Sequence, residues 1–173
     1  MNACDTGFPC SANPNARILI LGSMPSVKSL IAAQYYAHPQ NAFWPIIEEL
    51  FSFNSGLEYE QRLACLRTNH VALWDVAQQC IRPGSMDHAI DMESVTPNDF
   101  SVFFDTHPHV RAIFFNGRKA EELFRKRVLS LLSDKHRQIE RHLLPSSSPA
   151  HAGISRAQKL EAWKIIVQTL ENS

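Results

Sequence analysis

The sequence predicts one three-layer α/β/α domain built around a central, mainly parallel sheet of four strands. Four short apolar runs each end in a polar turn, and segments with helical spacing lie between them, which is the alternation expected of a parallel sheet. The chain has 173 residues and is 45% hydrophobic, enough for one substantial core. The expected strands are Arg17–Leu21, Val71–Trp74, Val110–Phe115 and Gln138–Leu144.

The N-terminal residues 1–16 are expected to form a flexible leader, and residues 17–173 the single domain. The leader is rich in Asn, Pro, Ser and Gly and lacks the basic start and apolar centre of a signal peptide. No stretch approaches the roughly 20 apolar residues that a membrane span needs. We therefore expect a cytoplasmic protein without a membrane partner.

Helices are expected wherever apolar residues recur every three or four positions. Pro45 suits the first turn of the first long helix, and Thr96-Pro97 is a favourable start for a later one. The segment from Gln78 to Ser94 is expected to be irregular, with Arg82-Pro83-Gly84-Ser85 as its clearest turn. The expected helices are Phe43–Phe53, Leu57–Arg67, Pro97–Asp105, Arg118–Leu132 and Ser155–Leu170.

The charge of the chain is balanced overall but unevenly distributed. The 17 basic and 17 acidic residues cancel, which argues against a purely electrostatic nucleic-acid binder. Residues 1–105 hold 5 Lys/Arg against 11 Asp/Glu and residues 106–173 hold 12 against 6, so the two parts carry −6 and +6. Solvated helix surfaces and a shallow basic DNA-binding face explain this gradient equally well.

The four cysteines, Cys4, Cys10, Cys65 and Cys80, form no C-x-x-C pair. This spacing gives no support for a zinc site or an iron–sulfur cluster. We expect reduced thiols, no metal and no cofactor.

Polar loops follow all four expected strands: Gly22 to Pro25, Asp75, Asn116-Gly117, and Pro145 to Pro149. The carboxyl ends of parallel strands lie at one edge of the sheet, where open α/β folds bind ligands. Each loop alone could be an ordinary turn or helix cap. Together they predict a ligand pocket.

Two motifs carry a resemblance to a known family. Gly22-Ser23-Met24-Pro25, followed by Tyr35-Tyr36-Ala37-His38-Pro39-Gln40-Asn41-Ala42-Phe43-Trp44, resembles the first motif region of the uracil-DNA glycosylase superfamily. The Asn-x-Phe-Trp element is also similar to the mismatch-specific uracil and thymine glycosylases. Together with Leu144-Pro145-Ser146-Ser147-Ser148-Pro149, the sequence is most similar to the hypoxanthine-DNA (deoxyinosine) glycosylase branch.

The resemblance implies a monofunctional DNA glycosylase of base excision repair, which acts at the nucleoid in a bacterial-type cell. Such an enzyme flips a deaminated base (hypoxanthine, or also uracil or xanthine) out of double-stranded DNA and hydrolyses its N-glycosidic bond. Met24 and Ser146 stand where the best-known members carry an Asp or Asn and a His. The hypoxanthine branch implies Asn41 as the catalytic residue, whose side-chain carbonyl can hold a water in place.

Further residues receive roles on the same basis. Tyr36 or Phe43 is expected to stack on the flipped base, although for either residue alone a place in the core is the more common case. Asn116 and the backbone amides of the first loop are candidate donors to the leaving base. His38 is a second catalytic candidate because its unperturbed pKa lies near neutrality, and a simple loop corner is the competing interpretation. The expected base pocket is Gly22, Ser23, Met24, Pro25, Tyr36, Phe43, Asp75 and Asn116.

The DNA-facing side is expected along the last loop and the start of the last helix, whose hydroxyls, amides and cations suit phosphate. Ala150 replaces the bulky wedge that the resemblance leads one to expect. The DNA-contacting residues are expected to be Ser146, Ser147, Ser148, Pro149, Ala150, His151, Arg156 and Lys159.

Two alternatives of other kinds stay open: a non-catalytic reader of damaged bases, which Met24 and Ser146 favour, and a nucleosidase acting on free nucleosides. A serine hydrolase has no support because no G-x-S-x-G elbow follows a strand. The expected active form is a monomer.

Overall fold

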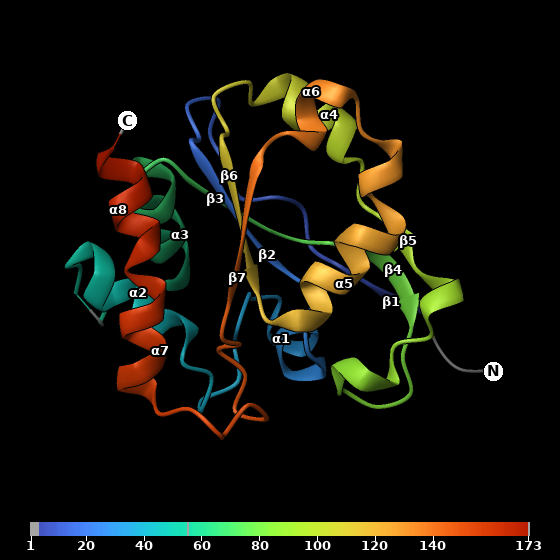
Figure 1. The fold of residues 1–173 in the computed structure, drawn as a ribbon. Helices are drawn as coiled ribbons and strands as arrows, with labels where there is room; N and C mark the ends of the chain where they lie inside the picture. Colours follow the sequence, from blue (N-terminus) through green and yellow to red (C-terminus); the bar gives the residue numbers. More distant parts are fainter. Residues whose placement is uncertain (1–3, 55, 173) are drawn as a thin grey trace.

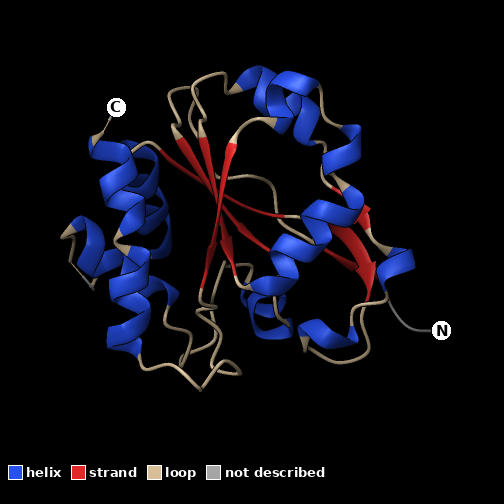
Figure 2. Cartoon of the chain, in the orientation of Figure 1, coloured by secondary structure: helices blue, strands red, loops and turns tan. Residues whose placement is uncertain are grey.

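The structure, a computed structural model, describes residues 4–54 and 56–172. Its centre is a four-stranded sheet with the strand order β3-β2-β6-β7 (Figures 1 and 2). All three neighbouring pairs are parallel, which confirms the predicted fold class. The strands are β2 (Ile18–Gly22), β3 (Val71–Asp75), β6 (Ala112–Asn116) and β7 (Glu140–Leu144).

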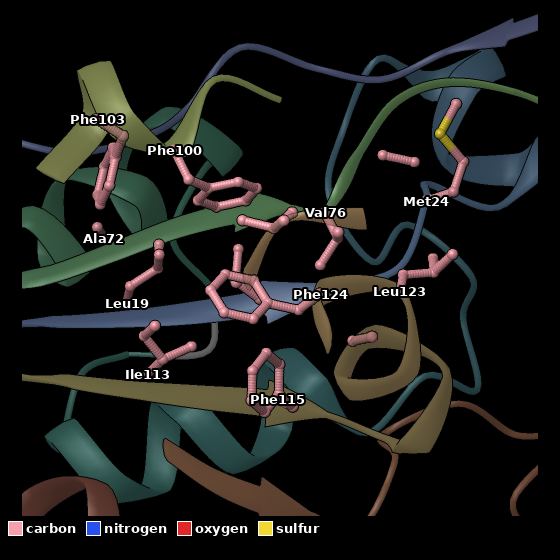
Figure 3. Packing of buried hydrophobic residues seen from close by; sticks show 14 of the residues in the cluster. Leu19, Met24, Ala72, Val76, Phe100, Phe103, Ile113, Phe115, Leu123 and Phe124 are labelled. Atoms are coloured by element: carbon pink, nitrogen blue, oxygen red, sulfur yellow. The ribbon is translucent and has the colours of Figure 1, made fainter. Parts of the chain in front are cut away.

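Helices cover both faces of this sheet (Figure 1). Alternation along β2 divides the core, because Ile18 and Ile20 pack on one face while Leu19 and Leu21 pack on the other. Figure 3 shows the face of the sheet on which Leu19 packs, where Leu19 and Ile113 face aromatic rings from the covering helices. One face carries α2 (Phe43–Phe51), α3 (Tyr59–Thr68), α7 (Arg156–Trp163) and α8 (Ile165–Glu171), and the other carries α4 (Phe100–Thr106) and α5 (Arg118–Arg127).

The strands that follow β2 in the chain are added on both of its sides. The chain steps from β2 to β3 on one side, whereas β6 pairs with β2 on its other side. Loops that leave adjacent strands in opposite directions open a crevice at the carboxyl edge of the sheet. The expected site therefore falls at the switch point between β2 and β6.

A second, antiparallel sheet was not predicted. It has the order β1-β4-β5 and joins β1 (Cys4–Thr6), β4 (Ala77–Ile81) and β5 (Thr96–Pro97). The expectation of an irregular segment from Gln78 to Ser94 is thus wrong for its first part, and η1 (Asp87–Ala89) and η2 (Met92–Ser94) follow. Thr96-Pro97 belongs to a strand, and α4 begins instead after Asp99, whose side chain accepts from Val102 N at 3.0 Å.

The expectation of a flexible leader is wrong for residues 4–16, and Met1 to Ala3 lie outside the described residues. Strand β1 pairs with β4, and Ser11 exchanges two backbone hydrogen bonds with Leu73 at 2.9 and 2.8 Å. The Trp74 indole donates to Phe8 O at 3.1 Å. Short strands and single bridges with partners more than 60 residues away leave no local periodicity to find in the sequence.

Three helical details differ from the expectations. The helix predicted for 118–132 ends earlier, because α5 stops at Arg127. It is followed by the separate short helices η3 (Leu129–Leu131) and α6 (Asp134–Arg137). Predicted helix 155–170 is interrupted at Lys164 between α7 and α8. A short helix, α1 (Val27–Ala32), follows the first loop. Within the described residues, the helices are too short or too polar for any of them to cross a membrane.

Candidate active site

A cleft of about 380 Å³ opens at the carboxyl edge of the parallel sheet. The ends of β2, β3 and β6 and the loop after β7 all contribute to it, as the sequence predicts. Its volume is in the range of small-molecule sites. The predicted site residues that line it are Gly22, Ser23, Met24, Pro25, Tyr36, Asn41, Asp75, Asn116, Ser146, Ser147, Ser148, Ala150 and His151.

The first loop, Gly22 to Ser26, is held by backbone and side-chain bonds. Val76 N donates to Gly22 O at 2.9 Å, and Ala77 N donates to Ser23 O at 3.0 Å. Ser23 Oγ donates to the Asp87 carboxylate at 2.7 Å, and Ser26 caps α1. The loop is therefore a fixed wall of the cleft.

Met24 lines the cleft but belongs to the hydrophobic core. Only 5% of its surface is exposed, and it joins the cluster that contains Leu19 and Phe124 (Figure 3). A thioether in this environment cannot hold a water for attack on a sugar. Met24 therefore cannot supply the polar group that the resemblance places at this position.

The aromatic pair is arranged as two layers. The Tyr36 and Phe43 rings stack with centroids 4.0 Å apart and planes inclined by 21°. Phe43 is fully buried at 0% exposure and does not line the cleft, whereas Tyr36 does. Of the two candidates for stacking on a base, only Tyr36 is accessible, and Phe43 supports it from below.

Asn41 lies between two neighbouring clefts. It lines the first cleft and also a neighbouring one of about 350 Å³. Its Oδ1 accepts from Phe43 N at 2.9 Å, which fixes the side chain and leaves the second lone pair of the carbonyl oxygen for another donor. The next residue, Ala42, donates its N–H to Ser147 O at 3.0 Å and so ties this loop to the loop after β7.

His38 is not brought to the site. It lines neither cleft, and its Nδ1 accepts from Gln40 N at 3.1 Å within the same loop. The geometry matches the loop-corner alternative, because a ring nitrogen that accepts from its own backbone stabilises a turn.

Asp75 is the most perturbed acid in the cleft. It is 3% exposed at the end of β3, and its Oδ2 has no hydrogen-bond partner. Burial raises the pKa of Asp75 to about 8; the negative charge of Asp87 adds to this, and Arg82 opposes it. Partial burial also raises the pKa of Asp87. Asp75 therefore holds its proton at neutral pH.

The predicted DNA-facing residues divide into buried and exposed groups. Ser147 is 1% exposed and Lys159 is 5% exposed, which differs from the expectation that both face DNA. Lys159 Nζ instead donates to Ser148 O at 3.3 Å, and burial lowers the pKa of its ammonium group. The exposed residues are Pro149, Ala150, His151 and Arg156. All of them but Ala150 line the second cleft, the one of about 350 Å³.

Sequence reasoning missed Arg82 and Asp87. The Arg82 side chain is fully buried, bonds the Asp5 carboxylate at 2.7 Å and donates to Pro25 O at 2.7 Å, so it fixes the first loop. In the sequence Arg82 appears only as the start of a Pro-Gly turn. Its function depends on a strand 77 residues away, which no local pattern reveals.

The described residues contain no group of three or more His, Cys, Asp or Glu side chains that could hold a metal ion. The four cysteines are free.

Comparisons with known proteins agree with this arrangement. A family model for the Uracil DNA glycosylase superfamily matches residues 9–170. The chain is 38% identical over 161 residues to the Hypoxanthine DNA glycosylase of Methanosarcina acetivorans, covering 92% of this chain and 96% of the relative. It is 38% identical over 117 residues to the protein of the same name from Methanosarcina barkeri, covering 67% and 73%.

A solved structure is similar over nearly the full length. It is the solution NMR structure of a candidate uracil DNA glycosylase from Methanosarcina acetivorans. The superposition has a TM-score of 0.80 at 38% identity and covers 98% of this chain and 99% of the other. The residues matched by the family model, 9–170, include all the loops that line the cleft.

Proposed function

Because the chain belongs to the Uracil DNA glycosylase superfamily, we propose that it is a monofunctional DNA glycosylase that removes hypoxanthine from double-stranded DNA. The observation that carries this proposal is the position of Asn41, which shares one cleft with Asp75 and Asn116 at the switch point of the sheet. The two relatives named Hypoxanthine DNA glycosylase support the choice of base. We further propose that the protein acts as a monomer.

In the proposed reaction, the nucleotide leaves the duplex and its base enters the cleft against the accessible face of Tyr36. The bond between C1′ of the sugar and N9 of hypoxanthine breaks, and its electron pair leaves with the purine. Water adds its oxygen to C1′, and the purine takes up a proton. The products are free hypoxanthine and an abasic site.

Asn41 positions the attacking water. An amide cannot remove a proton from water, but its carbonyl oxygen can orient one. Orientation suffices when the glycosidic bond breaks early and leaves an oxocarbenium-like sugar, because such a cation reacts with a weak nucleophile. The bond from Phe43 N fixes the carbonyl for this purpose. His38 has no part in this assignment because it lies outside the cleft.

We propose that the protein has no lyase activity. A bifunctional enzyme needs an amine to attack C1′ and form a Schiff base. Among the described residues that line the first cleft there is no lysine, and Lys159 is held by Ser148 O in the second cleft. We therefore expect the abasic site to stay intact until it is cleaved by alkali.

The test uses four duplexes that differ in one base: hypoxanthine, uracil, xanthine and undamaged adenine. Each is incubated with excess protein, and abasic sites are then cleaved with alkali. We expect strand scission with hypoxanthine, none with adenine, and none without alkali. Tight binding to the hypoxanthine duplex without scission would indicate a damaged-base reader, and cleavage of free inosine alone would indicate a nucleosidase.

A further inference from the structure

Three residues that line the cleft have a buried polar atom without a hydrogen-bond partner in the described part of the chain: Asp75 (Oδ2), Tyr36 (Oη) and Arg82 (Nη1). The Arg82 guanidinium is held through its other nitrogens by Asp5 and Pro25 O, whereas Asp75 and Tyr36 lie together at the end of β2. Leaving a buried polar group unsatisfied destabilises the folded protein, so each such group in a native structure calls for an explanation. A ligand that enters the cleft and bonds both atoms would supply one.

The Asp75 carboxyl group and the Tyr36 hydroxyl both lie next to Gly22. Gly22 and Asp75 are paired across β2 and β3. A Cβ placed on Gly22 would lie 2.3 Å from Asp75 Oδ1 and 3.0 Å from Tyr36 Oη. Only glycine therefore leaves room for the carboxyl group and the phenol at this position.

Tyr36 is held in place by its backbone and by its ring. Its φ is 55°, a left-handed conformation that is strained for a residue with a side chain and that recurs at functional sites. Its ring is stacked on the buried Phe43. The hydroxyl is thus aimed at the region above Gly22 by a rigid support.

Both groups carry hydrogen at neutral pH. The titratable and charged groups around Asp75 are Asp87 and Arg82 from the segment after β4, Tyr35 and Tyr36 before α2, and Tyr59 on α3. Burial keeps Asp75 protonated below a pKa of about 8. Burial also raises the pKa of Tyr36 far above neutrality, and the nearby Asn116 amide counteracts this only in part.

We propose that Asp75, as a neutral carboxylic acid supported by the Tyr36 hydroxyl, donates a hydrogen bond to the ring carbonyl oxygen of the flipped base. This inference rests on the proposed glycosylase function. Deamination converts the exocyclic amino group of adenine or cytosine into a carbonyl, so a donor at this point favours the deaminated base over its parent. Guanine has the same carbonyl at C6, and this contact does not exclude it.

The same hydrogen bond assists departure of the base. As the glycosidic bond breaks, the leaving purine gains negative charge, part of it on O6. A donor already in place near O6 stabilises that charge, because it needs no reorganisation as the charge develops. The proton stays on Asp75, so the carboxyl group is regenerated without a transfer step.

The first experiment is a pH series of single-turnover cleavage of the hypoxanthine duplex from pH 6 to pH 9.5. We expect wild-type cleavage to fall about tenfold per pH unit above the Asp75 pKa. Asp75→Asn keeps a donor that does not titrate, so its rate is expected to stay level across this range. Asp134→Asn, which alters an exposed carboxyl outside the cleft, should retain the wild-type profile.

A rate fall that persists in Asp75→Asn, or a level wild-type profile, would overturn the inference. A wild-type protein that cleaves no duplex would instead count against the proposed function. A binding measurement separates the two failures and does not depend on folding of a variant. The Asp75 carboxyl carbon is followed by NMR in wild-type protein with uncleavable duplexes that contain 2′-fluoro-deoxyinosine or 2′-fluoro-deoxyadenosine. We expect a shift with the first duplex only, and equal shifts with both would refute the contact.

Discussion

Asn116 and Ser147 exchange two hydrogen bonds. Asn116 Nδ2 donates to Ser147 Oγ, and Ser147 N donates to Asn116 Oδ1, both at 2.8 Å. The pair joins the end of β6 to the loop after β7, and Ser147 O in turn accepts from Ala42 N. The position of Asn41 therefore depends on Asn116 through one buried serine. Asn116 acts as a positioning residue, and its amide is largely engaged by the protein itself.

Asn116→Ala removes both bonds and leaves the hydroxyl and the backbone N–H of the buried Ser147 without the partners that Asn116 supplies. We expect the free energy of unfolding in urea to fall by about 2–4 kcal/mol. We also expect single-turnover cleavage of the hypoxanthine duplex to fall at least tenfold, because the Asn41 loop loses its anchor. Ser147→Ala removes only the hydroxyl partner and should cost about 1 kcal/mol. Equal stability of the Asn116 variant and the wild type would show that the pair does not hold the loops.

Asn41→Ala tests the catalytic assignment directly. The variant loses the carbonyl that orients water, so we expect single-turnover cleavage to fall by a factor of 100 or more, with duplex binding within threefold of wild type. Asn41→Asp keeps an oxygen that accepts from Phe43 N and can hold water, and should cleave within about tenfold of wild type. Near wild-type cleavage by Asn41→Ala would exclude Asn41 as the catalytic residue.

Much of the fold was predictable because each strand of the parallel sheet is a short apolar run closed by a polar turn. Residues such as Gly22 and Asp75 follow those runs directly, so their convergence follows from the topology of a parallel sheet. The second sheet was not predictable from local patterns. Its central strand β4 has five residues, and it pairs with β1, which lies far away in the sequence, and with the very short β5.

The roles of individual site residues were less predictable than their location. Tyr36 and Phe43 are equivalent by sequence, and only the packing decides that Tyr36 faces the cleft. Both Arg156 and Lys159 are cations at the start of α7, yet Lys159 is buried and Arg156 is exposed. Periodicity specifies a helix face, but the packing of a loop against that face decides which cation reaches solvent.

The ion pair between Arg82 and Asp5 predicts an effect of the N-terminal strand on the site. The Arg82 side chain is fully buried, so Asp5→Ala leaves an uncompensated guanidinium. We expect a loss of about 3 kcal/mol in unfolding free energy, together with weaker cleavage because Arg82 also bonds Pro25 O. Asp134→Ala breaks the exposed pair with Arg137 and serves as the control, with an expected loss below about 0.5 kcal/mol. Similar losses in both variants would show that Arg82 needs no buried partner.

The end of β6 and the loop after β7 approach each other closely at Gly117. Its φ is 94°, and an added Cβ would lie 2.9 Å from Ser146 Cβ. Gly84 also has a positive φ, of 81°, but an added Cβ there meets nothing within 4 Å. Gly84→Ala should therefore cost about 1 kcal/mol of backbone strain. Gly117→Ala should cost about 1–3 kcal/mol more and reduce cleavage by displacing Ser146. Equal losses in thermal unfolding would refute the close approach.

The buried carboxyl of Asp75 predicts how stability depends on pH. Its folded-state pKa of about 8 lies above the unfolded value of 3.8, so ionisation is harder in the native protein. Asp75 therefore costs no stability below about pH 4, an increasing amount between pH 4 and pH 8, and a constant amount above pH 8. Asp75→Asn removes this cost, so its advantage in unfolding free energy should grow across that window to about 2–5 kcal/mol. Urea unfolding at pH 4, 6, 8 and 9 measures the difference, with Asp134→Asn as the control for loss of an exposed carboxylate. A constant difference between Asp75→Asn and the wild type over this series would mean that Asp75 ionises in the native protein as it does in the unfolded chain.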